Sequence, residues 1–168
     1  MPAYPLSKLP DHSRLWIFAA DKPIDASRIA EFEQRLSGIV GVWQAHGKAL
    51  AGGCEIRYGQ FAFIAADENI EAPSGCSIDS LTHEIAQLGS EFGVNFLSGM
   101  RVFYRAGSAI GSVDRVKFRA LVEKGEVALD TIVFNNTLTS LSELRAGSWE
   151  VPASRSWHAQ AFRFPAVA

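Results

Sequence analysis

The sequence is poor in cysteine and has no long apolar run. Its two cysteines in 168 residues, Cys54 and Cys76, lack the spacing of a metal site. A chain of this length buries enough surface to fold without a disulfide, so we expect both to be reduced thiols. Residues 1–12 contain three prolines and no continuous apolar stretch, which is typical of neither a signal peptide nor a membrane anchor. We therefore expect a cytoplasmic protein that does not associate with a membrane.

A strong excess of charge of one sign is also missing. Sixteen Lys and Arg residues against 18 Asp and Glu residues give a net charge of −2, and no run of like charges exceeds two residues. Because nucleic acid attracts proteins through a basic field, we expect no nucleic-acid partner. With 48% hydrophobic and 20% charged residues, the composition is that of a folded globular protein. No internal repeat or linker is visible, so we expect a single domain over residues 1–168.

The spacing of apolar residues predicts an α+β fold with a ferredoxin-like core. Strand, helix, strand, strand, helix and strand follow one another, which is the order in which two helices cover one face of an antiparallel sheet. The predicted elements are a strand at 14–20, a helix from Asp25 to Gly47, a hairpin of strands 54–58 and 61–66 turning at Gly59-Gln60, a helix over 77–92 capped by Ser77, and a strand at 100–105.

The last third of the chain predicts an α-β-α segment and a tail. A helix over 112–124, a strand at 131–134 and a short helix opened by a capping box from Ser140 to Glu143 are expected to extend the same sheet, without a second core. The tail over 149–168 holds aromatic residues between prolines. We expect it to form an irregular aromatic strap over the core.

Several segments carry a family resemblance. They are Trp43-x-x-His46, the strand end Asp67-Glu68, the runs Ser74-Gly75-Cys76-Ser77-Ile78-Asp79 and Thr131-Ile132-Val133-Phe134-Asn135-Asn136, and the tail pieces Trp149-Glu150-Val151-Pro152 and Ser156-Trp157. Together they resemble a family of small uncharacterised bacterial proteins often labelled "ABC transporter ATPase", a resemblance that implies no established activity. The phosphate-binding loop Gly-x-x-x-x-Gly-Lys-Ser/Thr is missing, since its nearest approach, Gly41 to Lys48, has one residue too many and is followed by Ala49. We therefore reject the ATPase label and predict no cofactor.

The loop over 67–79 is the leading candidate for a site, because it leaves a strand and enters a helix N-terminus, where backbone N–H groups collect. Gly75 would let the backbone approach a ligand, and the helix dipole would favour a thiolate at Cys76. Under the alternative interpretation, Cys76 is a small buried hydrophobe, and Ser74, Gly75 and Ser77 serve the turn and the cap.

Four carboxylates fall on the same loop, at Asp67, Glu68, Glu71 and Asp79. Such a group would repel a phosphate and would suit a hard cation or an amine-bearing ligand. The alternative is a solvated acidic loop, and the sequence leaves open whether a metal binds.

Other polar side chains could contribute to a site. Trp43 and His46 are three residues apart and are expected on one helical face, with His46 favoured by the helix C-terminus. His83 is expected to point to solvent beside Asp79. Asn135 ends a predicted strand and could offer an amide to a ligand, although turn formation also explains it.

Three functional hypotheses follow. The leading one is a protein that binds a small molecule or a protein partner around the loop over 67–79, with help from His46 and Asn135. The second is a thiol-dependent enzyme in which Cys76 is the nucleophile and His46 is its base. The third is a structural or assembly protein, for example a homodimer, that acts through the aromatic tail residues Trp149, Trp157, Phe162 and Phe164.

Overall fold

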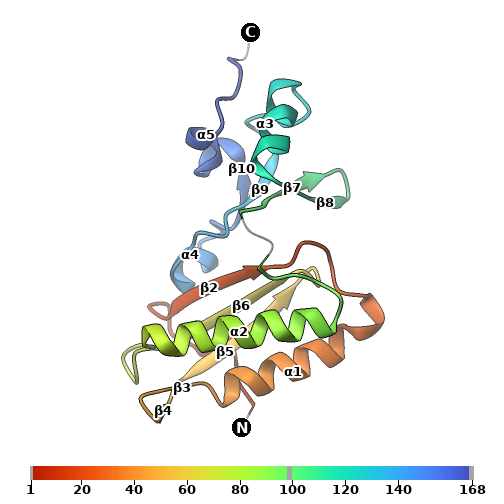
Figure 1. Ribbon diagram of the computed structural model, residues 1–168. Helices are drawn as coiled ribbons and strands as arrows, with labels where there is room; N and C mark the ends of the chain where they lie inside the picture. The colour runs from red at the N-terminus through yellow and green to blue at the C-terminus, as the bar shows by residue number, and fades with distance from the viewer. Residues whose placement is uncertain (1, 98–99, 167–168) are drawn as a thin grey trace. The chain divides into compact units, whose positions relative to one another are not determined.

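A computed structural model describes residues 2–97 and 100–166 as an α+β protein with three β-sheets (Figure 1). The chain forms two compact units. The first contains Met1–Leu97 and Thr137–Arg145, and the second contains Ser98–Asn136 and Ala146–Ala168. The single domain expected over the whole chain stays a prediction. Within the described ranges, no helix has both the length and the apolar character needed to cross a lipid bilayer.

The first unit is built on a mixed four-stranded sheet in the order β1-β5-β6-β2. Its strands are β1 (Tyr4–Pro5), β5 (Gly52–Arg57), β6 (Phe61–Ala66) and β2 (Arg14–Ala19). β6 pairs antiparallel with both β5 and β2, while β1 runs parallel to β5. The predicted hairpin is thereby confirmed, and its turn places Tyr58 at φ 55° and Gly59 at φ 61°, a backbone conformation that glycine adopts readily.

Two helices, α1 (Ile29–Gly41) and α2 (Gly75–Glu91), lie side by side on one face of this sheet (Figure 1). A short 3-10 turn, η2 (Ala26–Arg28), precedes α1, and the Asp25 side chain accepts a hydrogen bond from the Ser27 backbone N–H. The apolar faces of the helices meet the sheet in one core, whose buried members include Phe32, Leu36, Val40, Leu81, Ile85, Leu88, Ala62, Ile64 and Ala66. The periodicity that predicted both helices is therefore the pattern of their buried faces.

The first helix ends earlier than the sequence predicts. It stops at Gly41, not Gly47, and a two-stranded sheet of β3 (Gln44–Ala45) and β4 (Lys48–Ala49) follows. His46 and Gly47 turn this hairpin at φ 52° and φ 76°. Two successive positive φ values are typical of a tight hairpin turn, so the prediction that Trp43 and His46 share a helical face is wrong.

The second unit has its own sheet, in the order β10-β9-β7-β8. Its strands are β7 (Val102–Ala106), β8 (Ala109–Val113), β9 (Ile132–Phe134) and β10 (Glu150–Pro152), and its helices are α3 (Arg115–Glu123) and α5 (His158–Ala161) with the 3-10 turn η3 (Ala153–Arg155). A separate core contains Val102, Phe118, Val122, Val127, Val133, Val151, Ala153 and Phe162. The prediction that these elements extend the first sheet without a second core is therefore wrong.

The ferredoxin-like core is not confirmed, because the strand expected to complete the first sheet pairs elsewhere. β7 lies between β9 and β8, and the far edge of β2 is met by a single bridge from Arg14 to Ser140. The helix predicted from Ser112 begins at Arg115, because Ser112 and Val113 belong to β8. The tail is not irregular, since it supplies β10, η3 and α5; its last two residues, 167 and 168, lie outside the described residues.

Two short elements complete the first unit, the 3-10 turn η1 (Leu6–Lys8) and the helix α4 (Leu141–Arg145). The predicted capping box is present at α4: Glu143 N donates to Ser140 Oγ at 3.3 Å, and Ser140 N donates to Glu143 Oε1 at 3.1 Å. Hydrogen bonds to the Glu143 carboxylate, first from the Thr139 backbone N–H and then from Ser140, hold the pKa of Glu143 below its usual range.

Candidate functional site

The loop over 67–79 starts at a buried carboxylate. Asp67 Oδ1 accepts hydrogen bonds from His12 Nε2 at 2.7 Å and from the Asn69 backbone N–H at 3.0 Å. The Asp67 side chain is 13% exposed and that of His12 is 49% exposed. The His12 hydrogen bond is the main reason why the pKa of Asp67 lies below its usual range. Sequence reasoning missed His12, which comes 55 residues before its partner.

Two other carboxylates of the loop also have basic partners. Glu68 lies 3.5 Å from Arg14, and Glu71 lies 3.4 Å from Lys48 Nζ. Three of the four carboxylates therefore have a basic partner of their own. Over the part of the chain that the structure describes, no three His, Cys, Asp or Glu side chains are grouped so that they could hold a metal ion. The arrangement is better suited to holding the loop than to holding a hard cation.

The end of the loop caps α2 through Ser74, not through Ser77 as predicted. The Ser77 N–H donates to Ser74 Oγ at 3.1 Å, and the Ser74 N–H donates to Ser77 Oγ at 2.8 Å, which is a reciprocal capping box. Ser77 is buried, and its carbonyl accepts a hydrogen bond from Trp43 Nε1 at 2.8 Å. The two serines are therefore committed to the structure of the helix start.

Cys76 lies in the first turn of α2 and is exposed, so the interpretation of this thiol as a buried hydrophobe is wrong. A Cβ on Gly75 would meet nothing within 4 Å, so close packing does not require a glycine there. Asp79 is exposed on the same helix. Three residues of the predicted site are thus accessible at the beginning of α2.

The predicted partners of Cys76 are not joined to it. His46 is exposed at the β3–β4 turn, and His83 is exposed on α2, as expected. Among the residues that the structure describes, neither imidazole forms a hydrogen bond with the thiol. Asn135 belongs to the second unit, where its backbone N–H donates to the Trp149 carbonyl at 2.7 Å. The roles assigned to these side chains stay predictions.

A groove that the sequence did not indicate starts beside this helix turn. One hollow of about 340 Å³ lies between the ends of the two helices and is lined by Ile39, Val42, Trp43, Gln44, Ser80, Leu81 and Glu84. A second hollow of about 200 Å³ shares Ile39 and Glu84 and continues to Arg35, Gln87, Leu88 and Glu91. We call the joined hollows the α1–α2 groove. Its lining combines the apolar side chains of Ile39 and Val42 with amide, hydroxyl, carboxylate and guanidinium groups, while Leu81 and Leu88 are almost fully buried.

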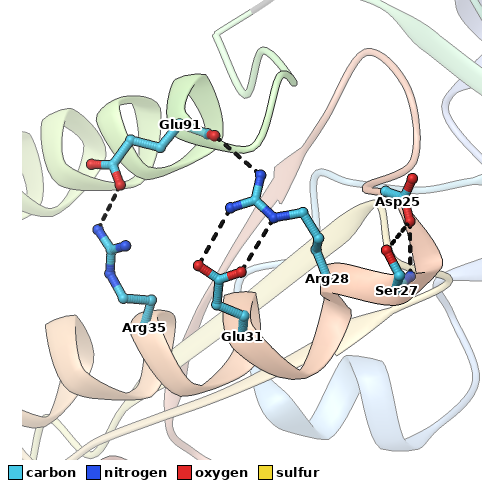
Figure 2. A network of polar contacts seen from close by, with 6 residues as sticks. All are labelled: Asp25, Ser27, Arg28, Glu31, Arg35 and Glu91. Atoms are coloured by element: carbon cyan, nitrogen blue, oxygen red, sulfur yellow. Dashed lines mark hydrogen bonds and ion pairs between the residues drawn. The ribbon is translucent and has the colours of Figure 1, made fainter.

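One ion pair and one hydrogen bond link the end of α2 to α1 and the turn before it, at the far end of the groove (Figure 2). Arg35 Nη2 lies 2.8 Å from Glu91 Oε2, and Arg28 contacts both the Glu91 carbonyl at 3.4 Å and the Glu31 carboxylate at 3.2 Å. Because Trp43 binds the start of α2 and Arg28 binds its end, the helices run antiparallel. The groove therefore follows the line between them from Ser80 to Glu91.

The aromatic residues of the tail pack inside the second unit. Trp149 is 3% exposed and Phe162 is fully buried, while Trp157 and Phe164 pack against the same core. Trp149 Nε1 donates to Asn136 Oδ1 at 2.8 Å, so the second asparagine of that pair has a structural role. These contacts favour the core interpretation of the tail over an exposed apolar patch.

Comparison of the chain with protein-family models, with curated proteins and with solved structures gives no match. The candidate site therefore has to be interpreted from its own geometry.

Proposed function

We propose that the protein is a binding module that holds a short segment of a partner protein in the α1–α2 groove. The observation that supports this proposal is the pair of joined hollows, which share Ile39 and Glu84 and begin at the helix turn that follows the predicted site loop. A groove that offers a few apolar contacts among many polar groups suits a peptide segment, which brings both apolar side chains and backbone hydrogen-bonding groups. The proposal keeps the binding function expected from the sequence and moves its centre from the loop to the groove.

The size of the groove suits a short peptide. From Ser80 to Glu91 the groove follows α2 for eleven residues, or roughly 16 Å at about 1.5 Å per residue. An extended segment of about five residues, or about three turns of helix, covers that length. Val42, which is 63% exposed at one end, offers an apolar contact. Glu84 has no ion-pair partner within the described ranges, so it favours a segment that carries Lys or Arg at its centre.

Selection of peptides from a displayed random library, followed by measurement of their Kd values, tests the proposal. Peptides that bind in the groove should bind the Val42→Asp variant at least roughly tenfold more weakly, because the carboxylate removes an apolar contact and sits in the binding site. Val116→Asp is the matched control, since Val116 is a 76% exposed valine outside the groove. Equal losses of affinity in both variants, or selected peptides that bind outside the groove, would contradict the proposal. If only a panel of small molecules gives binding, the ligand of the groove is a small molecule and not a peptide.

The thiol-dependent enzyme is the second candidate, and the exposure of Cys76 favours it. A catalytic thiol needs a base within hydrogen-bond reach, so the enzyme requires His46 to move toward Cys76 when substrate binds. If Cys76 is alkylated no faster than a model thiol at neutral pH, the thiol-dependent enzyme is excluded. Assembly through the tail is third, because its aromatic side chains are used in the core of the second unit.

The family resemblance, the cytosolic location and the absence of a nucleic-acid partner also stay proposals. The peptide-binding experiment on the groove does not depend on any of them.

A further inference from the structure

A separate hollow of about 330 Å³ lies between β1, α1 and β5. Its apolar lining comes mainly from Tyr4 of β1, Leu36 of α1 and Ile56 of β5. This volume falls within the usual range for small-molecule pockets, which combine apolar walls with a few polar groups. The hollow shares no lining residue with the α1–α2 groove.

The charge in this hollow has one sign. Its lining includes the carboxylates of Glu33 and Glu55 but no Lys or Arg. Glu55 is paired with Arg57 at 2.6 Å, whereas Glu33 has no ion-pair partner among the residues described. Cys54 also lines the hollow, and burial first and the Glu33 charge second raise the pKa of its thiol to about 11.

We propose that this hollow binds a small primary amine with an apolar body, whose ammonium group pairs with the Glu33 carboxylate. The apolar body would lie against Tyr4 and Ile56, which are both still partly exposed, and would remove apolar surface from water. An anion of the same shape would be repelled by the Glu33 carboxylate, and a neutral molecule would lack the ion pair. Charge and shape together select a cationic, partly apolar ligand.

The first experiment compares three ligands of one shape: cyclohexylamine, cyclohexanol and cyclohexanecarboxylate. NMR titrations of the whole chain at pH 7 should show shifts at the residues lining this hollow, with the amine binding roughly two- to fivefold more tightly than the alcohol and the carboxylate not binding. Glu33→Gln should remove the difference between amine and alcohol. Glu126→Gln, which changes an exposed glutamate of the second unit, should keep it. Equal affinities for amine and alcohol in the natural protein would overturn the proposal.

The second experiment uses Cys54 as a reporter from inside the hollow, in a Cys76→Ser background. The thiol is treated with 2-aminoethyl methanethiosulfonate, a cation, and with 2-sulfonatoethyl methanethiosulfonate, an anion. The rate with the cation divided by the rate with the anion should be roughly two- to fivefold higher for Cys54 than for a free thiol. The Glu33→Gln substitution should lower this ratio. Because a ratio cancels any change in thiolate content, a ratio unchanged by Glu33→Gln would refute the charge selection. Val42→Asp should leave both results unchanged, which separates this site from the groove.

Discussion

His158 allows the electrostatics of the second unit to be tested at a single side chain. The residue is fully buried and its ring stacks on Trp157 with centroids 3.9 Å apart. Nδ1 shares a hydrogen bond with Ser156 Oγ at 2.8 Å, while Nε2 has no hydrogen-bond partner among the described residues. Burial, followed by the charge of Arg115, lowers the pKa of His158 from 6.5 to about 4. The imidazole should therefore stay neutral in the folded protein throughout the range from pH 5 to 7.

This lowered pKa makes folding stability depend on pH with a defined sign. In the unfolded chain the imidazole takes up a proton as the pH falls through 6.5, whereas in the folded chain it does so only near pH 4. Folding stability is therefore highest above pH 6.5, falls progressively as the pH drops from 6.5 to about 4, and levels off below that value. A difference of 2.5 between the two pKa values corresponds to about 3 kcal/mol in the free energy of unfolding, at about 1.4 kcal/mol for each pKa unit.

NMR titration of the imidazole signals measures the pKa directly, and urea unfolding from pH 7 to pH 4 measures its effect on stability. His158→Asn is the control variant, because its amide can keep the bond to Ser156 without a titrating ring. The natural protein should lose about 3 kcal/mol more than the variant between pH 7 and 4. A folded-state pKa near 6.5, or equal losses in both proteins, would refute the burial of a neutral imidazole.

Three further predictions concern other parts of the chain. At pH 7.5 iodoacetamide should modify the exposed Cys76 well before Cys54, because the raised pKa of Cys54 leaves about 100-fold less thiolate than an ordinary thiol has. Peptide mass spectrometry measures both rates of modification, and equal rates in the folded protein would contradict this prediction. Ser74→Ala should destabilise the protein by about 1 kcal/mol in urea unfolding, and Ser90→Ala, on the exposed side of the same helix, by less than half as much. Gly111→Ala should lower Tm, since its Cβ would lie 2.4 Å from the Tyr104 ring; an unchanged Tm would show that the ring moves aside freely.

The elements that the sequence predicted well are those with local signals. The hairpin of β5 and β6 has two apolar strands around a glycine turn, and α2 has a full apolar face with a serine at its start. In both cases the residues that define the element are within a few positions of one another. The capping box at Ser140 and Glu143 was likewise predicted because it is complete within four residues.

The second sheet was missed for a different reason. β9 and β10 are three residues each, and β8 contains Gly111 and Ser112, so their apolar patterns are too short to reveal their partners. A strand sequence does not specify the sheet to which it belongs, because that depends on pairing with distant residues. The strand at Val102–Ala106 was therefore predicted nearly in place but assigned to the wrong sheet.

The end of α1 shows how an apolar pattern can extend past its helix. Val40 and Trp43 are both buried at helical spacing, yet the helix stops between them at Gly41. Trp43 is held by its bond to the Ser77 carbonyl, a tertiary contact that preserves the burial without the helix. Val42, at the break, is left exposed and becomes an end of the α1–α2 groove.

The contact between His12 and Asp67 could have been found from the sequence by one further step. The strands at 14–20 and 61–66 were both predicted, and antiparallel pairing of their ends matches Arg14 with Ala66, as the structure has it. Continuing that register by two residues brings His12 opposite Glu68, one position from Asp67. A carboxylate at the end of a buried strand needs a partner, since an unpaired buried charge is costly. Its charged partner is therefore best sought beside the matching end of the neighbouring strand, while the loop that follows supplies only the Asn69 N–H.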